Sequence, residues 1–362
     1  MHQIRRVYEM KRVGILLLLG TSLFAQDNIS YVDSAVAPSH QEGFPLWAYG
    51  YVEPPQPPED WSQNCLGTRP RDCDRPGGMP RDTSGTLMHV EGSELSFTQT
   101  QITAPFSPAD WFPGDHPKMP DIVAYGLEDI GMRACAICHL PNGQGLMQNA
   151  PVAGLPVDYF LRQLDDFSTG TRQTTDTHKA NGFEMAAMAR ALTPKQAREI
   201  AEYYGSIPFK PWVKIIESDA VPKFQASRNG LFTKLEGSET EPLGMRLIEL
   251  PVSTYATNNL RNPRSGMVAY TPIGSLARGE ALVTTGGDNS MECLTCHGPD
   301  LRGTPIAPPI AGRQPSYIGR QLYDMQQGNR AGPMAVVMNP AVDRLTPGDI
   351  IAISAYVAAQ EP

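Results

Sequence analysis

Residues 135–139 read Cys-Ala-Ile-Cys-His, and residues 293–297 repeat the pattern as Cys-Leu-Thr-Cys-His. Two thiols three residues apart can reach one porphyrin edge and form thioethers with its vinyl groups, and the following histidine can bind the iron. Zinc and thioredoxin-like sites also use Cys-x-x-Cys pairs, but a zinc site leaves both histidines unexplained and no βαβ pattern surrounds either motif. The motifs therefore predict two covalently bound haem c groups, attached through Cys135, Cys138, Cys293 and Cys296, with His139 and His297 as axial iron ligands.

The N-terminus is basic and then apolar. Residues 1–25 hold four basic residues, and an apolar run over residues 13–24 precedes Ala25. This order is typical of a cleaved export signal, although an uncleaved anchor remains an alternative. Removal of this segment leaves 26 basic against 37 acidic residues, a formal charge of −11. Such an excess disfavours nucleic-acid binding and favours basic protein partners, and we expect no transmembrane segment after cleavage.

The sequence around the first motif recurs around the second. The pattern Tyr-x-x-Arg-Gln-Leu-x-Asp-x-x-x-Gly-x-Arg occupies residues 159–172 and again residues 317–330. Its glycine falls where a helix of about three turns would end. A Leu-Thr-Pro sequence then recurs at residues 192–194 and 345–347, where threonine can cap a closing helix and proline can take its first position. Each repeat is predicted to contain a short helix, the haem motif, a loop, a middle helix, a loop with methionine and a closing helix.

One methionine lies at the same position in both of these last loops. Met185 and Met338 each stand seven residues before the leucine of the Leu-Thr-Pro sequence. Thioether sulfur is a soft ligand that favours reduced iron. We therefore expect Met185 and Met338 to be the second axial ligands, whereas Met188, Met325 and Met334 are expected to fill core space.

The duplicated haem motif, the Tyr-x-x-x-Gln-Leu helix and the methionine seven residues before Leu-Thr resemble the class I cytochromes c, most closely the two-haem cytochrome c4 type. The resemblance covers residues 116–208 and 273–362 and implies all-α domains, His/Met ligation and periplasmic electron transfer. It also implies that each haem histidine donates its second N–H to a backbone carbonyl eleven residues later, that of Ala150 or Pro308. The family joins its domains by a short linker, so the long segment here leaves open whether the two domains pack together.

We thus expect an all-α protein with two tandem class I cytochrome c domains, an irregular Pro-rich N-terminal extension and a long interdomain linker. The extension is read either as a wrap over the haem domains or as a docking arm for a redox enzyme. The predicted boundaries are a signal peptide over 1–25, the extension over 26–115, haem domain 1 over 116–208, the linker over 209–272 and haem domain 2 over 273–362.

Four further residues are candidates for the sites. Cys65 and Cys73 are the two cysteines outside the haem motifs, and export to an oxidising compartment would allow them to form a disulfide, with two free thiols as the alternative. Arg162 and Arg320 occupy matching positions in the repeats. Guanidinium groups suit carboxylates, so these two arginines either bind haem propionates or serve as surface or interface arginines.

Three functions fit these features, and we favour the first. It is a periplasmic, non-enzymatic carrier that passes single electrons between a respiratory donor, such as a dehydrogenase or quinol-oxidising complex, and an acceptor such as a terminal oxidase. The second is a haem-bearing electron-transfer subunit of a quinoprotein or flavin dehydrogenase complex. The third is a dihaem peroxidase, which needs an open sixth iron position and nearby acid–base groups. The duplicated methionine argues against such an open position.

Overall fold

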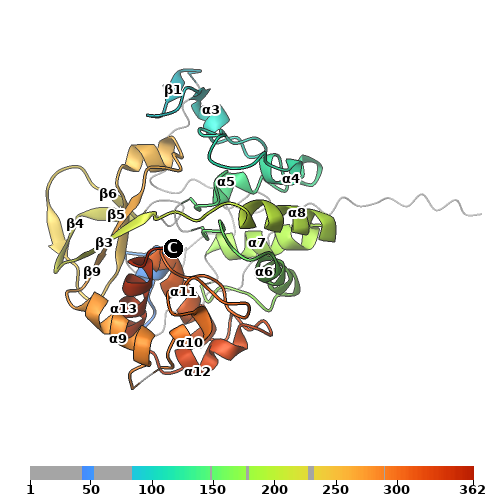
Figure 1. Ribbon diagram of the computed structural model, residues 1–362. Coiled ribbons are helices and arrows are strands. Elements are labelled where there is room, and N and C mark those ends of the chain that lie inside the picture. Colours follow the sequence, from blue (N-terminus) through green and yellow to red (C-terminus); the bar gives the residue numbers. More distant parts are fainter. Residues whose placement is uncertain (1–42, 53–83, 147–148, 177–178, 227–231, 289) are drawn as a thin grey trace, which may run out of the picture.

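The computed structural model describes residues 43–52, 84–146, 149–176, 179–226, 232–288 and 290–362. The two repeats lie against each other, joined by an antiparallel bridge between Arg172 and Arg330. Figure 1 shows the segment between the repeats at the left, the first repeat at the right and the second repeat below. Among the described residues, no helix is both long enough and apolar enough to cross a membrane.

The first repeat is built from helices joined by loops. Its middle helix ends at Gly170, which takes a left-handed φ of 78° that costs glycine little. Thr193 caps the closing helix, Pro194 takes its first position and Gln196 completes a capping box, so this predicted helix start is confirmed. The elements of this repeat are α4 (Asp121–Ala124), η1 (Glu128–Ile130), α5 (Ala136–His139), α6 (Val157–Thr169), α7 (Ala180–Ala191) and α8 (Pro194–Gly205).

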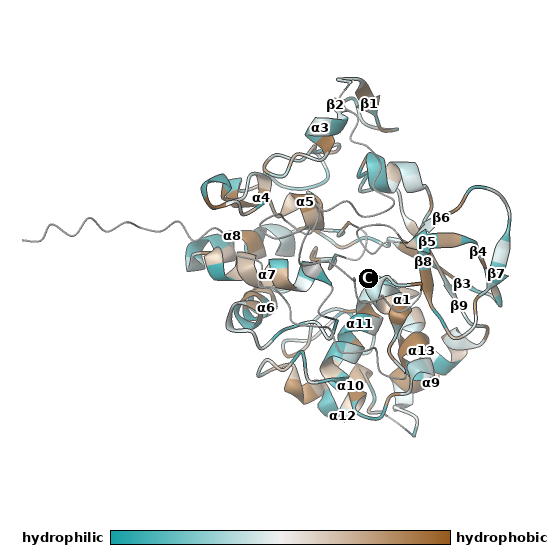
Figure 2. Ribbon diagram, turned by 180° about the vertical axis from the view of Figure 1, so that it is seen from behind, coloured by the Kyte–Doolittle hydropathy of each residue, from teal (hydrophilic) through white to brown (hydrophobic). Residues whose placement is uncertain are grey.

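The second repeat follows the same order. Its closing helix is capped by Thr346, again as predicted, and Asp349 in the third position completes a capping box. This helix is largely hydrophobic and buried along most of its length (Figure 2), because it lies in the largest core cluster of the described chain. The elements here are α9 (Ser275–Thr285), α10 (Leu294–His297), α11 (Pro315–Gln326), η3 (Val336–Met338), α12 (Asn339–Val342) and α13 (Pro347–Ala358).

The predicted loop with Met185 is instead helix α7, which corrects the sequence reading of the first repeat. The segment Ala180–Ala191 is rich in alanine and contains no proline, so its helix propensity is high. The matching segment of the second repeat contains Pro333 and Pro340 around two adjacent valines. Proline interrupts helical hydrogen bonding, and only the short η3 and α12 form there.

The expectation of an all-α chain is wrong for residues 209–272. Buried and half-buried residues alternate along Met267–Thr271, as in a strand with one buried face, whereas the sequence predicted only a linker here. A three-stranded sheet forms in the order β3-β9-β8, with β3 parallel and β8 antiparallel to β9. The elements of this segment, called the insert below, are β3 (Val213–Glu217), β4 (Ala220–Pro222), β5 (Phe224–Ala226), β6 (Phe232–Lys234), β7 (Thr240–Pro242), β8 (Ile248–Pro251), the π-helical η2 (Tyr255–Asn259) and β9 (Met267–Thr271).

The described parts of the N-terminal extension lie in two places. Residues 43–52 contain helix α1 (Leu46–Tyr49), which packs on α11 of the second repeat. Residues 84–115 contain β1 (Leu87–His89), β2 (Ser96–Thr98) and α3 (Gln99–Ile102), and they share a small core with Leu260 of the insert. The extension is therefore mostly irregular in its described residues, but each part is anchored to a different portion of the chain.

Candidate functional site

The first haem motif lines a cavity. Cys135 lies at the N-cap of the single turn α5, which contains Cys138 and ends at His139. All three side chains line the cavity together with Met185 of α7 and apolar residues of α6 and α8. Four residues of the second repeat also line it: Tyr317, Arg320, Gln321 and Asp324. The first site therefore includes a wall from the other repeat, which sequence comparison of the repeats did not reveal.

Both haem histidines are held as predicted. His139 Nδ1 lies 2.9 Å from the Ala150 carbonyl oxygen, and His297 Nδ1 lies 2.8 Å from the Pro308 carbonyl oxygen. A carbonyl oxygen accepts only, so Nδ1 carries the proton and Nε2 keeps a lone pair for a metal. Burial lowers the pKa of both histidines, which favours the neutral ring that a metal ligand requires.

The two candidate methionines share a register in the sequence but lie in different secondary structure, Met185 inside α7 and Met338 in η3. Met185 and His139 line the same cavity, while Met338, at the end of η3, packs on the core cluster that also receives Cys293 and Leu294. Met188 lines the first cavity as well. The geometry of the first cavity thus admits either methionine, and the common register of Met185 and Met338 in the two repeats is what selects them.

The candidate arginines differ in their surroundings. Arg320 is buried, lines the first cavity, and donates from Nη1 to the Ala48 carbonyl oxygen at 2.7 Å. Arg162 is half-buried and lies outside the described lining of that cavity. Arg172 and Lys179 do line it, and sequence reasoning assigned them no role there. Arg172 closes the repeated motif, so its recurrence as Arg330 was the available signal.

The junction between the repeats is nearly symmetrical. Arg172 Nη2 donates to the Tyr317 hydroxyl at 3.0 Å and to Gln321 Oε1 at 2.9 Å, while Arg330 Nη2 donates to the Tyr159 hydroxyl at 2.8 Å and to Gln163 Oε1 at 2.9 Å. Each arginine therefore binds the middle helix of the opposite repeat. The two repeats pack directly despite the insert, which settles the arrangement that the long segment had left open.

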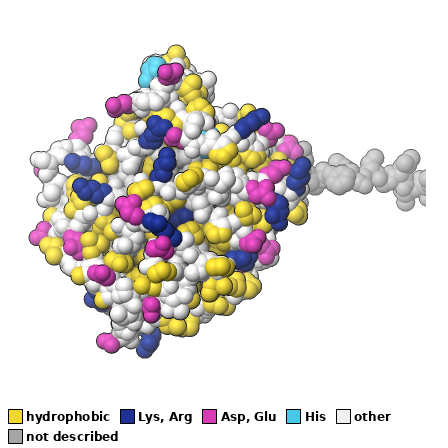
Figure 3. Space-filling model, viewed as in Figure 1, with side chains coloured by type: hydrophobic (Ala, Val, Ile, Leu, Met, Phe, Trp, Pro, Cys, Tyr) yellow, Lys and Arg dark blue, Asp and Glu magenta, His cyan; other side chains and the backbone are white. Residues whose placement is uncertain are grey.

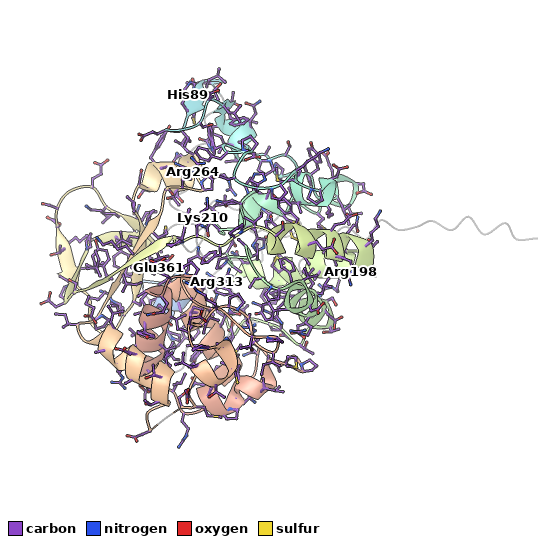
Figure 4. All side chains as sticks on the ribbon, viewed as in Figure 1. His89, Arg198, Lys210, Arg264, Arg313 and Glu361 are labelled. Carbon is purple, nitrogen blue, oxygen red and sulfur yellow. The ribbon has the colours of Figure 1, made fainter. Side chains whose placement is uncertain are left out.

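Arg313 adds a one-sided contact at the same junction, at the centre of Figure 4. It lies just before α11 and donates to the carbonyl oxygens of Pro151 and Ala153 in the first repeat, at 2.9 Å each. Burial lowers the pKa of its guanidinium to about 10, still above physiological pH. The charged side chain therefore fixes the start of α11 against the haem loop of the first repeat.

Helix α1 bridges the repeats near the first cavity. The Tyr49 hydroxyl donates to Asp324 Oδ1 of α11 at 2.6 Å, and Lys179 of the first repeat donates to the Tyr49 carbonyl oxygen at 3.0 Å. Burial raises the pKa of Asp324 and lowers that of Lys179 well below its usual value. Cys65 and Cys73 lie outside the described residues, so their disulfide remains a prediction.

The donor set fits haem c. One turn supplies two thiols and a neutral imidazole, and the cavity walls add a thioether and apolar side chains that exclude water. Haem bound there supplies a one-electron Fe(III)/Fe(II) couple. The chain's own contribution is to fix the imidazole through a carbonyl and to place buried cations, Arg172 among them, along the cavity.

Comparison with known proteins agrees with this site. No family model matches the chain. It is 35% identical to cytochrome c-554(548) of Halomonas halodenitrificans, over 21% of this chain and 93% of that protein. It is 24% identical to the thiosulfate dehydrogenase electron acceptor of Stutzerimonas stutzeri, over 66% of this chain and 83% of that protein. It is also 24% identical to cytochrome c4 of Stutzerimonas stutzeri, over 62% of this chain and 82% of that protein.

The match to the short relative covers 77 residues, which is less than one repeat, and the matches to the two longer relatives cover 240 and 232 residues, which is more than one repeat contains. The protein therefore carries two covalent haem c groups and transfers electrons. It belongs to the c-type cytochromes, as a two-haem, cytochrome c4-like member with an additional N-terminal segment.

Proposed function

We propose that the protein is a periplasmic electron carrier with two six-coordinate haems, ligated by His139 with Met185 and by His297 with Met338. The observation that carries the proposal is the shared design of the two sites. In each one, a backbone carbonyl fixes the histidine tautomer, and a methionine lies in the same register before the closing helix. Two filled coordination spheres suit electron transfer rather than substrate binding.

The proposed partners are redox proteins of the periplasm. The export signal predicted over residues 1–25 would deliver the chain to the compartment where such partners work. A dehydrogenase or a quinol-oxidising complex would donate electrons, and a terminal oxidase would accept them. The acidic balance of the chain supports association with basic partners that weakens as salt is added.

A second candidate is a haem-bearing electron-transfer partner of one particular dehydrogenase. The observation that favours it is the similarity to proteins named thiosulfate dehydrogenase electron acceptor, in Stutzerimonas stutzeri and in Thiomonas intermedia, each over more than three fifths of this chain. In this version the donor is an enzyme that oxidises an inorganic sulfur compound, and the protein leaves that enzyme after reduction.

The test combines spectroscopy and turnover on the exported protein. We expect two low-spin haems in the ferric state, reversible one-electron titration of both, and no peroxide consumption above a haem-protein background. Stopped-flow mixing with a purified thiosulfate dehydrogenase then separates the two candidates, because only the second requires fast, saturable reduction by that enzyme. A high-spin haem in the parent together with peroxide turnover would reject the carrier and support the peroxidase.

A further inference from the structure

The two repeats differ at two matching positions. One lies two residues before the first cysteine of the haem motif, and the other lies directly before the candidate methionine ligand. In the first repeat these positions hold Arg133 and Glu184, which form a buried ion pair next to the cavity. In the second repeat they hold Met291 and Val337, which are 54% and 62% exposed. The same face of the repeat is therefore closed and charged in one copy, and open and apolar in the other.

The chain's own additions cover this face of the first repeat. The amide of Ala134, a fully buried residue next to Cys135, donates to the Pro105 carbonyl oxygen of the extension at 2.9 Å. The insert adds Arg261, which lines the first cavity. We call residues 84–115 together with residues 255–264 the cap.

The two segments of the cap are held together by side-chain contacts. Trp111 Nε1 donates to the Leu260 carbonyl oxygen at 2.6 Å, which ties the extension to the insert. The Arg264 guanidinium makes two hydrogen bonds to Asp115, at 2.9 and 2.7 Å, and lies 3.6 Å from the centre of the Phe112 ring. Arg264 lies at this contact, between the insert and the top of the molecule in Figure 4. Two such bonds to one carboxylate hold both segments in register over the first repeat.

The second repeat leaves its matching face exposed. The segments that carry this face are adjacent, because Ser290 Oγ donates to the Ala341 carbonyl oxygen at 2.7 Å and Thr304 Oγ1 donates to the Cys296 carbonyl oxygen at 2.7 Å. Figure 3 shows hydrophobic side chains gathered at the lower edge of the molecule, over α12 and the loop before it. The exposed apolar residues of these segments, called the apolar patch below, are Met291, Ile306, Met334, Val336 and Val337.

Acidic side chains predominate around the apolar patch. The exposed charged residues that flank it in sequence are four acidic and two basic, namely Asp288, Glu292, Asp300, Asp343, Arg302 and Arg344. Arg302 and Asp300 lie 3.7 Å apart and offset each other, which leaves three acidic residues against Arg344. An apolar centre with an acidic surround is complementary to a protein surface with an apolar centre and a basic rim.

We propose that the apolar patch is the surface on which a redox protein with a basic rim docks, and that the cap closes the matching face of the first repeat to such a partner. The proposal rests on the proposed electron-transfer function and adds which of the two repeats exchanges electrons with the partner. Exchange with this partner takes place at the second repeat, and the junction of the two repeats connects it to the first.

The test removes the apolar centre and leaves the fold intact. The probe is mitochondrial cytochrome c, a basic redox protein, and its affinity for the full-length haem protein is measured by NMR titration at low salt. We expect the double variant Met291→Ser/Val337→Ser to weaken binding about tenfold, as for loss of central interface residues. Glu292→Lys should weaken binding and flatten its salt dependence. The matched control is Met245→Ser/Ile273→Ser, which removes two residues of 66% and 73% exposure elsewhere and should leave the affinity unchanged.

The outcomes separate this proposal from the carrier function. In the parent, titration with the probe should perturb the resonances of the second haem and leave those of the first in place. Equal perturbation of both haems, equal loss in the control pair, or no binding of the basic probe by the parent would each overturn the docking surface. None of these results touches the carrier function, which is judged from the spin state and peroxide turnover of the protein alone.

Discussion

Arg172 and Arg330 lie opposite each other where the two repeats meet, and each binds the tyrosine of the other's repeat. The exchange is reciprocal, because the two residues occupy the same position in a duplicated motif. Gln163 Oε1 accepts from both guanidinium groups, at 2.8 Å from Arg172 and 2.9 Å from Arg330. The junction therefore behaves as one buried hydrogen-bond network rather than as two separate contacts.

Arg330→Met should destabilise the protein by about 3 kcal/mol, because breaking a buried charged network leaves its partners without a donor. The measurement is urea unfolding followed by circular dichroism. Arg302→Met is the matched control, since Arg302 and Asp300 form an exposed pair and its loss should cost less than about 0.5 kcal/mol. Equal effects of the two variants would mean that the junction adds no stability.

Gly319→Ala should also destabilise the protein, although alanine is the better helix former by about 1 kcal/mol. A Cβ at Gly319 would lie 2.4 Å from Cη2 of the buried Trp47, so α1 could not keep its place on α11. We expect a net loss of about 2 kcal/mol and a shift of tryptophan fluorescence. Gly348→Ala is the control, because its Cβ would lie 3.2 Å from the flexible end of Met245 and 3.8 Å from Thr346 Oγ1, an ordinary contact distance.

Glu249→Gln should stabilise the protein at alkaline pH. Burial raises the pKa of Glu249 from 4.5 to about 7, against the opposing hydrogen bond from Ser316 Oγ and the positive charge of Arg320. The folded pKa exceeds the unfolded one, so the contribution of Glu249 is fully present below about pH 4.5 and is lost as pH rises through 7.

The size of this effect follows from the shift. A pKa raised from 4.5 to about 7 corresponds to about 3 kcal/mol by pH 8, and the glutamine variant should gain roughly this much at pH 8 and little at pH 4.5. Thermal or urea unfolding across pH 4.5 to 8 measures it. Glu236→Gln, at an exposed position of the insert, leaves Glu249 in place and should keep the pH dependence of the parent. A parent whose stability rises between pH 5 and 8 by as much as that of the Gln variant would contradict the role of Glu249.

Met185→Ala and Met338→Ala should each remove about half of the weak long-wavelength charge-transfer band expected of ferric His/Met haem. Each should lower one reduction potential and leave the other nearly unchanged, because separate sites usually behave additively. Met188→Ala and Met334→Ala are the controls. Met188 lines the first cavity, so loss of the band in that variant, with the band retained in Met185→Ala, would move the ligand to Met188.

Cys65 and Cys73 are predicted to be joined in the exported protein. Closing so short a loop gives on the order of 2–3 kcal/mol in the loop-entropy model. Mass spectrometry after alkylation of the denatured, unreduced protein checks the bond. Two alkylated thiols at these positions would disprove it, whereas alkylation only after reduction would support it.

The sequence was most informative where a local rule decides the structure. Three features were predicted, because each depends on residues close in the chain. They are the helix start at Thr193, the helix end at Gly170 and the carbonyl partner of His139. The strand Met267–Thr271 was missed, because a five-residue segment does not indicate a strand until the strands that pair with it are known. The place of Lys179 beside α1 depends on a contact across 130 residues, which no local pattern encodes.

The parallel pairing of β3 with β9 has a consequence for how the chain is threaded. Val213 lies beside Met267, and the Met267 amide donates to the Trp212 carbonyl oxygen at 2.9 Å. The backbone thus leaves the first repeat and rejoins the path to the second at almost the same point, with β9 leading on to α9. The chain between β3 and β9 therefore starts and ends at neighbouring points. Its length could change without changing the spacing of the two haem-binding units.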